Sequence, residues 1–269
     1  MRLCYNAHAM DNAFPIIDTH AHLHMDQFDA DRATVIERAV AAGVTRMVEI
    51  GYDLPSSHAA IALAEAYPQV FAVVGVQANH LDNLPTDWLA QVRALAAHPR
   101  VVAIGEIGLD FYWKKAPLEE QEEVLRLQLS LARELGLPVV IHSRDAQADT
   151  LRILADTARG QPGILHSFLG DWAFAEGCLD VGFMLSFSGP LTFAKLHDLH
   201  DVARRVPATM MLAETDSPYL TPHPHRGRRN EPAHVAYVVR QLAALRNEPL
   251  EQVAAQLWAN AERVFAKLG

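Results

Sequence analysis

The chain has 269 residues, of which 50% are apolar, and a formal net charge of −9 at neutral pH. This length and composition can bury a large core, either in one α/β barrel or in two small domains. The acidic balance argues against a protein coated in basic surface for nonspecific nucleic-acid binding, although a local basic patch survives such an average.

Eight short apolar runs alternate with stretches of helical periodicity along the chain. Their nearly continuous hydrophobicity is what strands covered on both faces require. The predicted strands are residues 16–22, 44–51, 70–77, 101–108, 138–143, 163–168, 183–188 and 209–216.

The segments between these strands carry helix signals. Residues 30–42 are followed by Gly43 and residues 118–135 by Gly136, and a glycine just past the last turn is a common helix stop. In residues 118–135, one face recurs at steps of three and four: Leu118, Gln121, Leu125, Gln128, Ala132 and Leu135. Glutamates crowd the first turn, near the positive end of the helix dipole.

Eight such strand-helix units in about 250 residues are the usual size of a (β/α)8 barrel. We therefore predict one TIM-barrel domain over residues 16–269, preceded by an N-terminal extension over residues 1–15 that has no periodicity. A doubly wound open sheet is the alternative, but no glycine-rich phosphate loop follows the first strand.

The cysteines and the apolar runs bear on the compartment. Cys4 and Cys178 are too few for a disulfide framework and lack the paired spacing of a metal site. No apolar run approaches the roughly 18 residues that cross a bilayer, and the first residues lack the apolar stretch of a secretion signal. We expect a cytoplasmic protein without membrane contact, and the sequence indicates no obligate protein partner.

Polar side chains recur where the predicted strands end, and in a barrel these ends form the rim that carries active sites. His20 and His22 stand one residue apart, so an extended strand directs both to the same face. Other strand ends add Glu106, His142, His166 and Asp216. A single member could belong to a structural hydrogen-bond network. Six together on one apolar funnel favour a metal site.

Imidazole nitrogens and carboxylate oxygens suit Zn, Mn, Fe or Mg, so the metal stays open, with Mg, Mn and Zn as the leading choices. Six ligands exceed what one tetrahedral catalytic ion needs, which favours two ions about 3.5 to 4 Å apart sharing a carboxylate. Glu106, central in the strand order, is the expected bridge. A shared water would be the nucleophile, and Asp216 could orient it and take its proton.

With these residues in place, the sequence resembles the TatD family of metal-dependent deoxyribonucleases, within the amidohydrolase-like barrels. The likeness runs from Ile16 to the end of the chain and rests on six ordered motifs. They are Asp18-Thr19-His20-Ala21-His22-Leu23, Gly105-Glu106-Ile107-Gly108-Leu109-Asp110, Ile141-His142-Ser143-Arg144, Leu165-His166-Ser167-Phe168, Glu214-Thr215-Asp216-Ser217-Pro218-Tyr219-Leu220 and His223-Pro224-His225-Arg226-Gly227-Arg228-Arg229-Asn230-Glu231-Pro232.

The resemblance implies phosphodiester cleavage in DNA, often as an exonuclease assisted by Mg or another divalent ion. Some family members are linked instead to deacylation of mischarged tRNA. The ligand sets that it implies are His20, His22, Glu106 and Asp216 for the first ion, and Glu106, His142 and His166 for the second.

One loop departs from the family. After the third strand, members usually read Gly-Val-His-Pro-His, whereas this chain reads Gly75-Val76-Gln77-Ala78-Asn79-His80. The lost histidine and proline change a loop that faces the substrate, so the nuclease activity and its strand preference stay open.

Four arginines are candidates for substrate binding. Arg226, Arg228 and Arg229 follow the last strand, and guanidinium groups bind phosphate in a bidentate manner. Arg144 shares a strand face with His142. The alternatives are a solvated basic loop for the three, and an ion pair with Asp110 or Asp145 for Arg144.

Phe111, Tyr112 and Trp113 follow the Glu106 strand and could stack an unpaired base, or they could simply pack between loop and helix.

The leading hypothesis is a two-metal phosphodiesterase acting on DNA ends or single strands, since a narrow barrel mouth does not easily admit a duplex. An amide or ester hydrolase competes with it, although many such barrels use a carboxylated lysine where this chain has Glu106. A noncatalytic scaffold is the third class, and degenerate ligands would indicate it. None of the six is degenerate.

Overall fold

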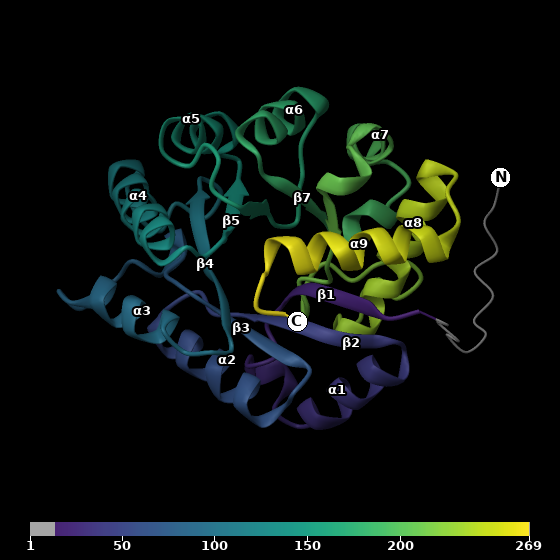
Figure 1. Ribbon diagram of the computed structural model, residues 1–269, viewed down its shortest axis with the longest axis horizontal. Coiled ribbons are helices and arrows are strands. Elements are labelled where there is room, and N and C mark those ends of the chain that lie inside the picture. Colours follow the sequence, from purple (N-terminus) through teal and green to yellow (C-terminus); the bar gives the residue numbers. More distant parts are fainter. Residues whose placement is uncertain (1–13, 269) are drawn as a thin grey trace.

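The structure, a computed structural model, describes residues 14–268 (Figure 1). Among these residues, eight parallel strands pair in chain order in one sheet. They are β1 (Ile16–Ala21), β2 (Val44–Ile50), β3 (Val70–Val74), β4 (Val101–Asp110), β5 (Val139–Arg144), β6 (Gly163–Leu165), β7 (Met184–Phe187) and β8 (Met211–Ala213). A parallel bridge between Ala21 and Ser217 brings the first strand to the last. The predicted (β/α)8 barrel is confirmed.

Helices follow the strands and wrap the barrel (Figure 1). In the described part of the chain the α-helices are α1 (Arg32–Ala41), α2 (Leu54–Ala66), α3 (Trp88–Ala96), α4 (Leu118–Leu135), α5 (Gln147–Thr157), α6 (Trp172–Val181), α7 (His197–Arg205), α8 (Val235–Arg246) and α9 (Leu250–Val264). Short 3-10 helices are η1 (Asp26–Phe28), η2 (Ala78–His80), η3 (Gly189–Thr192), η4 (Ala208–Met210) and η5 (Pro232–His234).

Two helix predictions can be compared with the structure. The prediction for α4 is confirmed at both ends, and Gly136 stops this helix in the left-handed conformation with φ 64°. Helix α1 is shorter than the predicted 30–42, because Asp31, with φ −147°, lies outside the helical region.

Three strands end earlier than predicted, at the rim that carries the candidate site. Strands β3, β6 and β8 each stop three residues before the predicted ends at 77, 168 and 216. Ser167 and Asp216 adopt φ values of 41° and 55°, and this left-handed region cannot continue a strand. His166 and Asp216 therefore lie on loops just beyond their strands.

A close approach between β4 and β5 places Glu106 beside His142. Gly108 has φ 147°, and a Cβ atom there would lie 1.9 Å from the carbonyl oxygen of His142. Only glycine allows this combination of conformation and proximity. The glycine of this motif therefore serves the packing of the two strands.

Apolar side chains form two buried layers. The larger lies between the sheet and the surrounding helices. The smaller fills the barrel interior and is completed by Val264, Phe265 and Leu268 at the end of the chain. Helix α9 packs against β1, β8 and η4, and in Figure 1 it lies beside β1. This end of the barrel is sealed by apolar side chains, so the polar residues gather at the opposite end.

A buried carboxylate joins the first and last strands. The carboxylate of Asp18 accepts hydrogen bonds from the Thr215 amide at 2.9 Å and the Thr215 hydroxyl at 2.6 Å. Burial raises the pKa of Asp18 to about 8 despite these bonds. The contact anchors the segment that leads to Asp216.

Most of the predicted extension, residues 1–15, falls outside the described residues. Of the remainder, Phe14 packs against the larger core layer. In the described part of the chain, no helix combines the length and apolar character that crossing a membrane requires.

Candidate active site

The six predicted metal ligands come together at the carboxyl-terminal rim. They lie at or just after five strands: His20 and His22 at the end of β1, Glu106 in β4, His142 in β5, His166 after β6 and Asp216 after β8. Their side chains are buried or nearly so, with Glu106 only 3% exposed. The barrel therefore concentrates four imidazoles and two carboxylates in one shielded space.

Glu106 lies between two histidine pairs and presents a different oxygen to each. Its Oε2 atom lies 3.5 Å from Nε2 of His20 and 3.8 Å from Nε2 of His22. Its Oε1 atom lies 2.8 Å from Nδ1 of His142 and 3.2 Å from Nε2 of His166. This is the geometry that a bridging carboxylate requires.

Asp216 completes the group around the first pair. Its Oδ1 atom lies 3.5 Å from Nε2 of His20 and 3.3 Å from Nε2 of His22. Two overlapping groups of ligand atoms, each within 4.8 Å, can hold a metal ion: His20 with His22 and Asp216, and His20 with Glu106 and His166.

The donor set fits divalent cations. Within each pair the ring nitrogens face each other at 3.2 Å, Nε2 of His20 against Nε2 of His22 and Nδ1 of His142 against Nε2 of His166. Buried nitrogens converging on one another and on carboxylates are arranged as ligands of a shared cation.

Protein acceptors fix the orientation of three of the rings. His22 bonds the Ile50 carbonyl through Nδ1 at 2.9 Å. Asp110 lies 3.0 Å from Nε2 of His142, and Glu214 lies 3.3 Å from Nδ1 of His166. Such partners set the tautomer and basicity of a ligating imidazole. Asp110 and Glu214 were not predicted in this role, although both stand in motifs at strand ends.

The altered loop after β3 joins this network. The Gln77 side chain donates to Oε1 of Glu106 at 3.2 Å and accepts from the Asn79 amide at 3.2 Å. The Asn79 side chain donates to Asp110 at 2.9 Å, and Asp110 in turn contacts His142. Gln77 and Asn79 thus close a ring of contacts that starts and ends at Glu106.

The charges of the cluster stabilise one another. Burial by itself would raise the pKa of Glu106, but the charge of His166 and hydrogen bonds from His142 hold it well below the ordinary value. Burial lowers the pKa of His22, yet contact with Asp216 outweighs it and brings the value to about 9. Without a cation, histidine protons would balance the carboxylates.

Of the three arginines after β8 that were predicted to bind substrate, one is paired within the protein and two are exposed. Arg229 is held by the protein, because it bonds both oxygens of Asp31 at 2.8 Å and the Gln27 carbonyl at 2.6 Å. Arg228 is exposed. The guanidinium of Arg226 lies 4.2 Å from the centre of the Phe193 ring.

Arg144, the last residue of β5, occupies a similar setting. Its guanidinium lies 3.9 Å from the centre of the Tyr112 ring and 5.7 Å from that of Trp113. These two aromatic side chains are 54% and 56% exposed, whereas Phe111 packs against the core. Neither Asp110 nor Asp145 forms an ion pair with Arg144 among the described residues.

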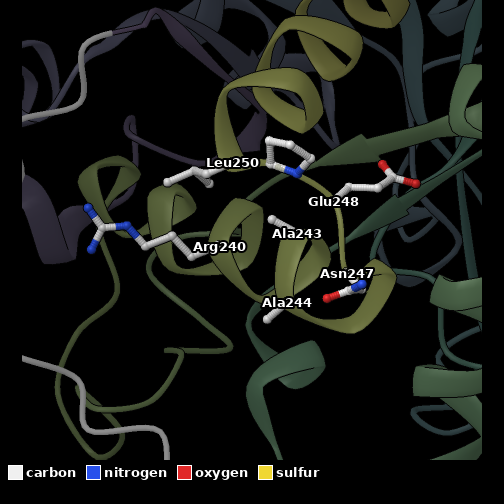
Figure 2. Close-up of a pocket in the computed structure, with 7 residues that line it drawn as sticks. Arg240, Ala243, Ala244, Asn247, Glu248 and Leu250 are labelled. Atoms are coloured by element: carbon white, nitrogen blue, oxygen red, sulfur yellow. The ribbon is translucent and has the colours of Figure 1, made fainter.

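Two surface hollows are lined by none of the six side chains. One, at the turn between α8 and α9, is lined by Arg240, Asn247, Glu248 and neighbouring residues (Figure 2). The end of α8 lies at the sealed end of the barrel, since the helices run opposite to the strands. The cluster itself occupies the barrel mouth.

A parallel barrel whose carboxyl-terminal rim gathers histidines around a shared carboxylate has the construction of a metal-dependent hydrolase. Residues 17–266 match the family model described as TatD related DNase, and the chain therefore belongs to this family.

Relatives and solved structures agree with this assignment. The chain is 43% identical to the metal-dependent hydrolase YabD of Bacillus subtilis, over 93% of this chain and 98% of the relative. It is 36% identical to the 3'-5' ssDNA/RNA exonuclease TatD of Citrobacter koseri, over 93% and 98%. The crystal structure of YJJV, a TatD homolog from Escherichia coli K12, superposes with TM-score 0.88 at 32% identity, over 93% and 98% of the two chains. The prediction of a metal-dependent hydrolase is confirmed.

Proposed function

We propose that the protein is a two-metal phosphodiesterase that cleaves DNA at strand ends or in single strands. The division of the Glu106 oxygens between two histidine pairs is the main support. The name of the Citrobacter relative, which specifies single-stranded DNA and RNA, supports a nucleic-acid substrate and adds RNA as a candidate.

In the proposed site, Glu106 would be shared by both ions. His20, His22 and Asp216 would hold the first ion, and His142 and His166 would hold the second. Mg, Mn and Zn all suit this mixture of nitrogen and oxygen donors. Zn is favoured because four of the donors are imidazoles.

When bound, two ions would supply positive charge to the phosphate and ease the deprotonation of the attacking water. Asp216 can accept that proton because it is charged at neutral pH. Burial raises its pKa, but the hydrogen bond from His22 and the charge of His20 outweigh burial and bring the pKa below its ordinary value. Asp110 and Glu214 keep the rings of His142 and His166 in place.

Substrate phosphates are assigned to Arg144, Arg226 and Arg228, which are exposed around the mouth. Arg229 instead holds its loop against Asp31. Tyr112 and Trp113 offer faces on which an unpaired base can stack, and such stacking favours single strands over duplexes.

We also place the protein in the cytoplasm. Cys178 is a free, buried thiol, and burial raises its pKa to about 12. A thiol of this kind is inert and suits a compartment where disulfides are rare.

The proposal is tested by hydrolysis of single-stranded oligonucleotides after the chelated protein is reloaded separately with Mg, Mn and Zn. We expect metal-dependent shortening from one end, and none with Asp216→Asn. Metal binding without cleavage of DNA or RNA would contradict the nuclease function and favour a small ester or amide substrate.

A further inference from the structure

We propose that Phe193, His223 and Arg226 form a second nucleotide-binding shelf, across the barrel mouth from Arg144, Tyr112 and Trp113. This inference rests on the proposed nuclease function and specifies how a single strand is held. The ligand is one nucleotide of that strand, with its base stacked on the shelf and its phosphate paired with Arg226.

The geometry of the shelf suits a nucleotide. The Arg226 guanidinium lies 4.2 Å from the centre of the Phe193 ring, and the His223 ring meets Phe193 edge-on, with centres 5.7 Å apart. Arg226 and His223 are exposed and Phe193 is half-buried. Aromatic rings and guanidinium planes both stack on bases, and a guanidinium also binds phosphate.

Two loops build the shelf and are held together. The His223 amide donates to the Thr192 hydroxyl at 2.9 Å, and that hydroxyl donates to the Gly189 carbonyl at 2.7 Å. A Cβ atom on Gly189 would lie 1.7 Å from the Leu220 carbonyl oxygen, so the loops touch backbone to backbone. A surface fixed in this way loses little conformational freedom when a ligand binds.

The candidate metal cluster lies between two surfaces that can bind a single strand: the shelf, and the group formed by Arg144, Tyr112 and Trp113. Phe193 follows β7, and His223 and Arg226 follow β8, whereas Tyr112 and Arg144 belong to the β4 and β5 side. In the ring order of the barrel these pairs of strands lie three positions apart. A strand that spans both surfaces crosses the mouth and presents a phosphate to the cluster.

The chain leads directly from the cluster to the shelf. Leu220 is four residues after Asp216, so the two lie within about 14 Å of each other even in a fully extended chain. Tyr219 stands between them and is 47% exposed. Burial, together with the charges of Asp216 and Glu106, raises the pKa of Tyr219.

Other arginines that lie on aromatic rings are held by protein acceptors; Arg100, over Phe71, bonds backbone carbonyls. Arg46 lies 4.8 Å from the Trp258 ring, but it is paired with Glu262 at 2.9 Å. Arg229 lies over Phe28 and is paired with Asp31. Within residues 14–268, Arg144 and Arg226 have no such acidic partner. Both arginines remain available for a phosphate.

The shelf is tested by fluorescence anisotropy with labelled single-stranded oligonucleotides and protein kept metal-free by a chelator, so that binding is measured without cleavage. Phe193→Leu keeps apolar volume and removes the ring. We expect it to weaken binding roughly 5- to 150-fold, the equivalent of one stacked base. Arg226→Gln should reduce the slope of log K against log salt by about 0.7, the value for one phosphate contact on a single strand.

Arg46→Gln is the matched control, since this arginine also lies on an aromatic ring but at the sealed end; it should leave affinity and salt slope unchanged. An oligonucleotide with one abasic position at the shelf should lose as much affinity as Phe193→Leu, and combining the two changes should cost nothing further.

Wild-type affinity and salt slope in both shelf variants would overturn the shelf, while cleavage by the same protein after it is reloaded with metal would leave the nuclease function standing. Failure of the wild-type protein to bind or cleave any oligonucleotide would overturn both. Arg226 is exposed, so its variant carries the test even if Phe193→Leu were to unfold.

Discussion

The two ends of the barrel are built from the same eight strands but bury opposite kinds of side chain. At the amino-terminal end, Phe265 and Leu268 close an apolar interior. At the carboxyl-terminal end, Glu106 shares an equally buried space with imidazoles. Burial of an apolar side chain stabilises the fold, whereas burial of an unpaired charge costs several kcal/mol.

The difference separates stability from function. Glu106 and Asp216 each lie close to histidines, so the cluster need not favour folding; its arrangement suits a site that binds cations. At the sealed end, the residues from the end of the chain that close the interior are Ala261, Val264, Phe265 and Leu268, all of them apolar. Substitutions at the two ends should therefore have different consequences.

The largest effect is expected for Glu106→Gln at the rim. The variant keeps the shape of the side chain but removes the charge shared by both histidine pairs. We expect kcat to fall by on the order of 10³-fold or more, and bound metal to fall below two ions per chain. Steady-state cleavage and metal analysis measure these effects. Retention of a tenth of the activity would show that Glu106 is not the bridge.

At the sealed end, Phe265→Ala should lower the free energy of unfolding by about 3 to 5 kcal/mol through the cavity that it leaves. Chemical denaturation measures this, and turnover per folded molecule should stay at the wild-type value. Val40→Ala is the control, because Val40 is 42% exposed and should change stability by less than about 0.5 kcal/mol. A fall in the kcat of folded protein would contradict the division between the two ends.

Gln77→Leu should lower the binding affinity of one of the two ions by roughly 10- to 100-fold, the usual effect of losing a group that orients a metal ligand. Gln77 touches Oε1 of Glu106, so the ion beside His142 and His166 should be the one affected. A competition titration against a chromophoric chelator measures both affinities. Gln147→Leu, elsewhere on the rim, serves as the control. Equal weakening of both ions would show that Gln77 acts on the whole cluster.

The pH dependence should distinguish metal-free from metal-loaded protein. The pKa of His22 is raised from 6.5 to about 9 in the folded chain. Its protonation stabilises the metal-free fold fully below pH 6.5, and this contribution is lost as the pH rises through 9. Because a metal needs the neutral ring, ion binding at pH 7 should release a proton from His22.

Calorimetry in two buffers of different ionisation enthalpy detects that proton. Loss of the His22 proton should by itself increase the affinity by up to about tenfold per pH unit between pH 7 and 9. His22→Ala should remove one proton from the count. Binding without proton release at pH 7 would rule out a charged His22 in the metal-free site.

Sequence patterns predicted the parts of the fold that depend on periodicity. The stripe of α4 and the stop at Gly136 fixed both helix ends. The predicted ends of β6 and β8 were wrong, because Ser167 and Asp216 adopt a left-handed conformation that their residue types do not predict.

The sequence placed six candidate ligands at strand ends, and the structure brings them together. It did not reveal the roles of Gln77, Asp110 and Glu214, because their contacts join strands that are distant in sequence. It also could not show that Arg229 is paired within the protein while Arg226 and Arg228 are exposed. Its partner Asp31 is 198 positions away, and only folding brings the two together.

Anomalous diffraction from crystals soaked in Mn tests the role of Glu106 most directly. We expect two peaks about 3.5 to 4 Å apart, one beside each carboxylate oxygen of Glu106. No peak, or a single peak that Glu106 does not contact, would contradict a two-metal site.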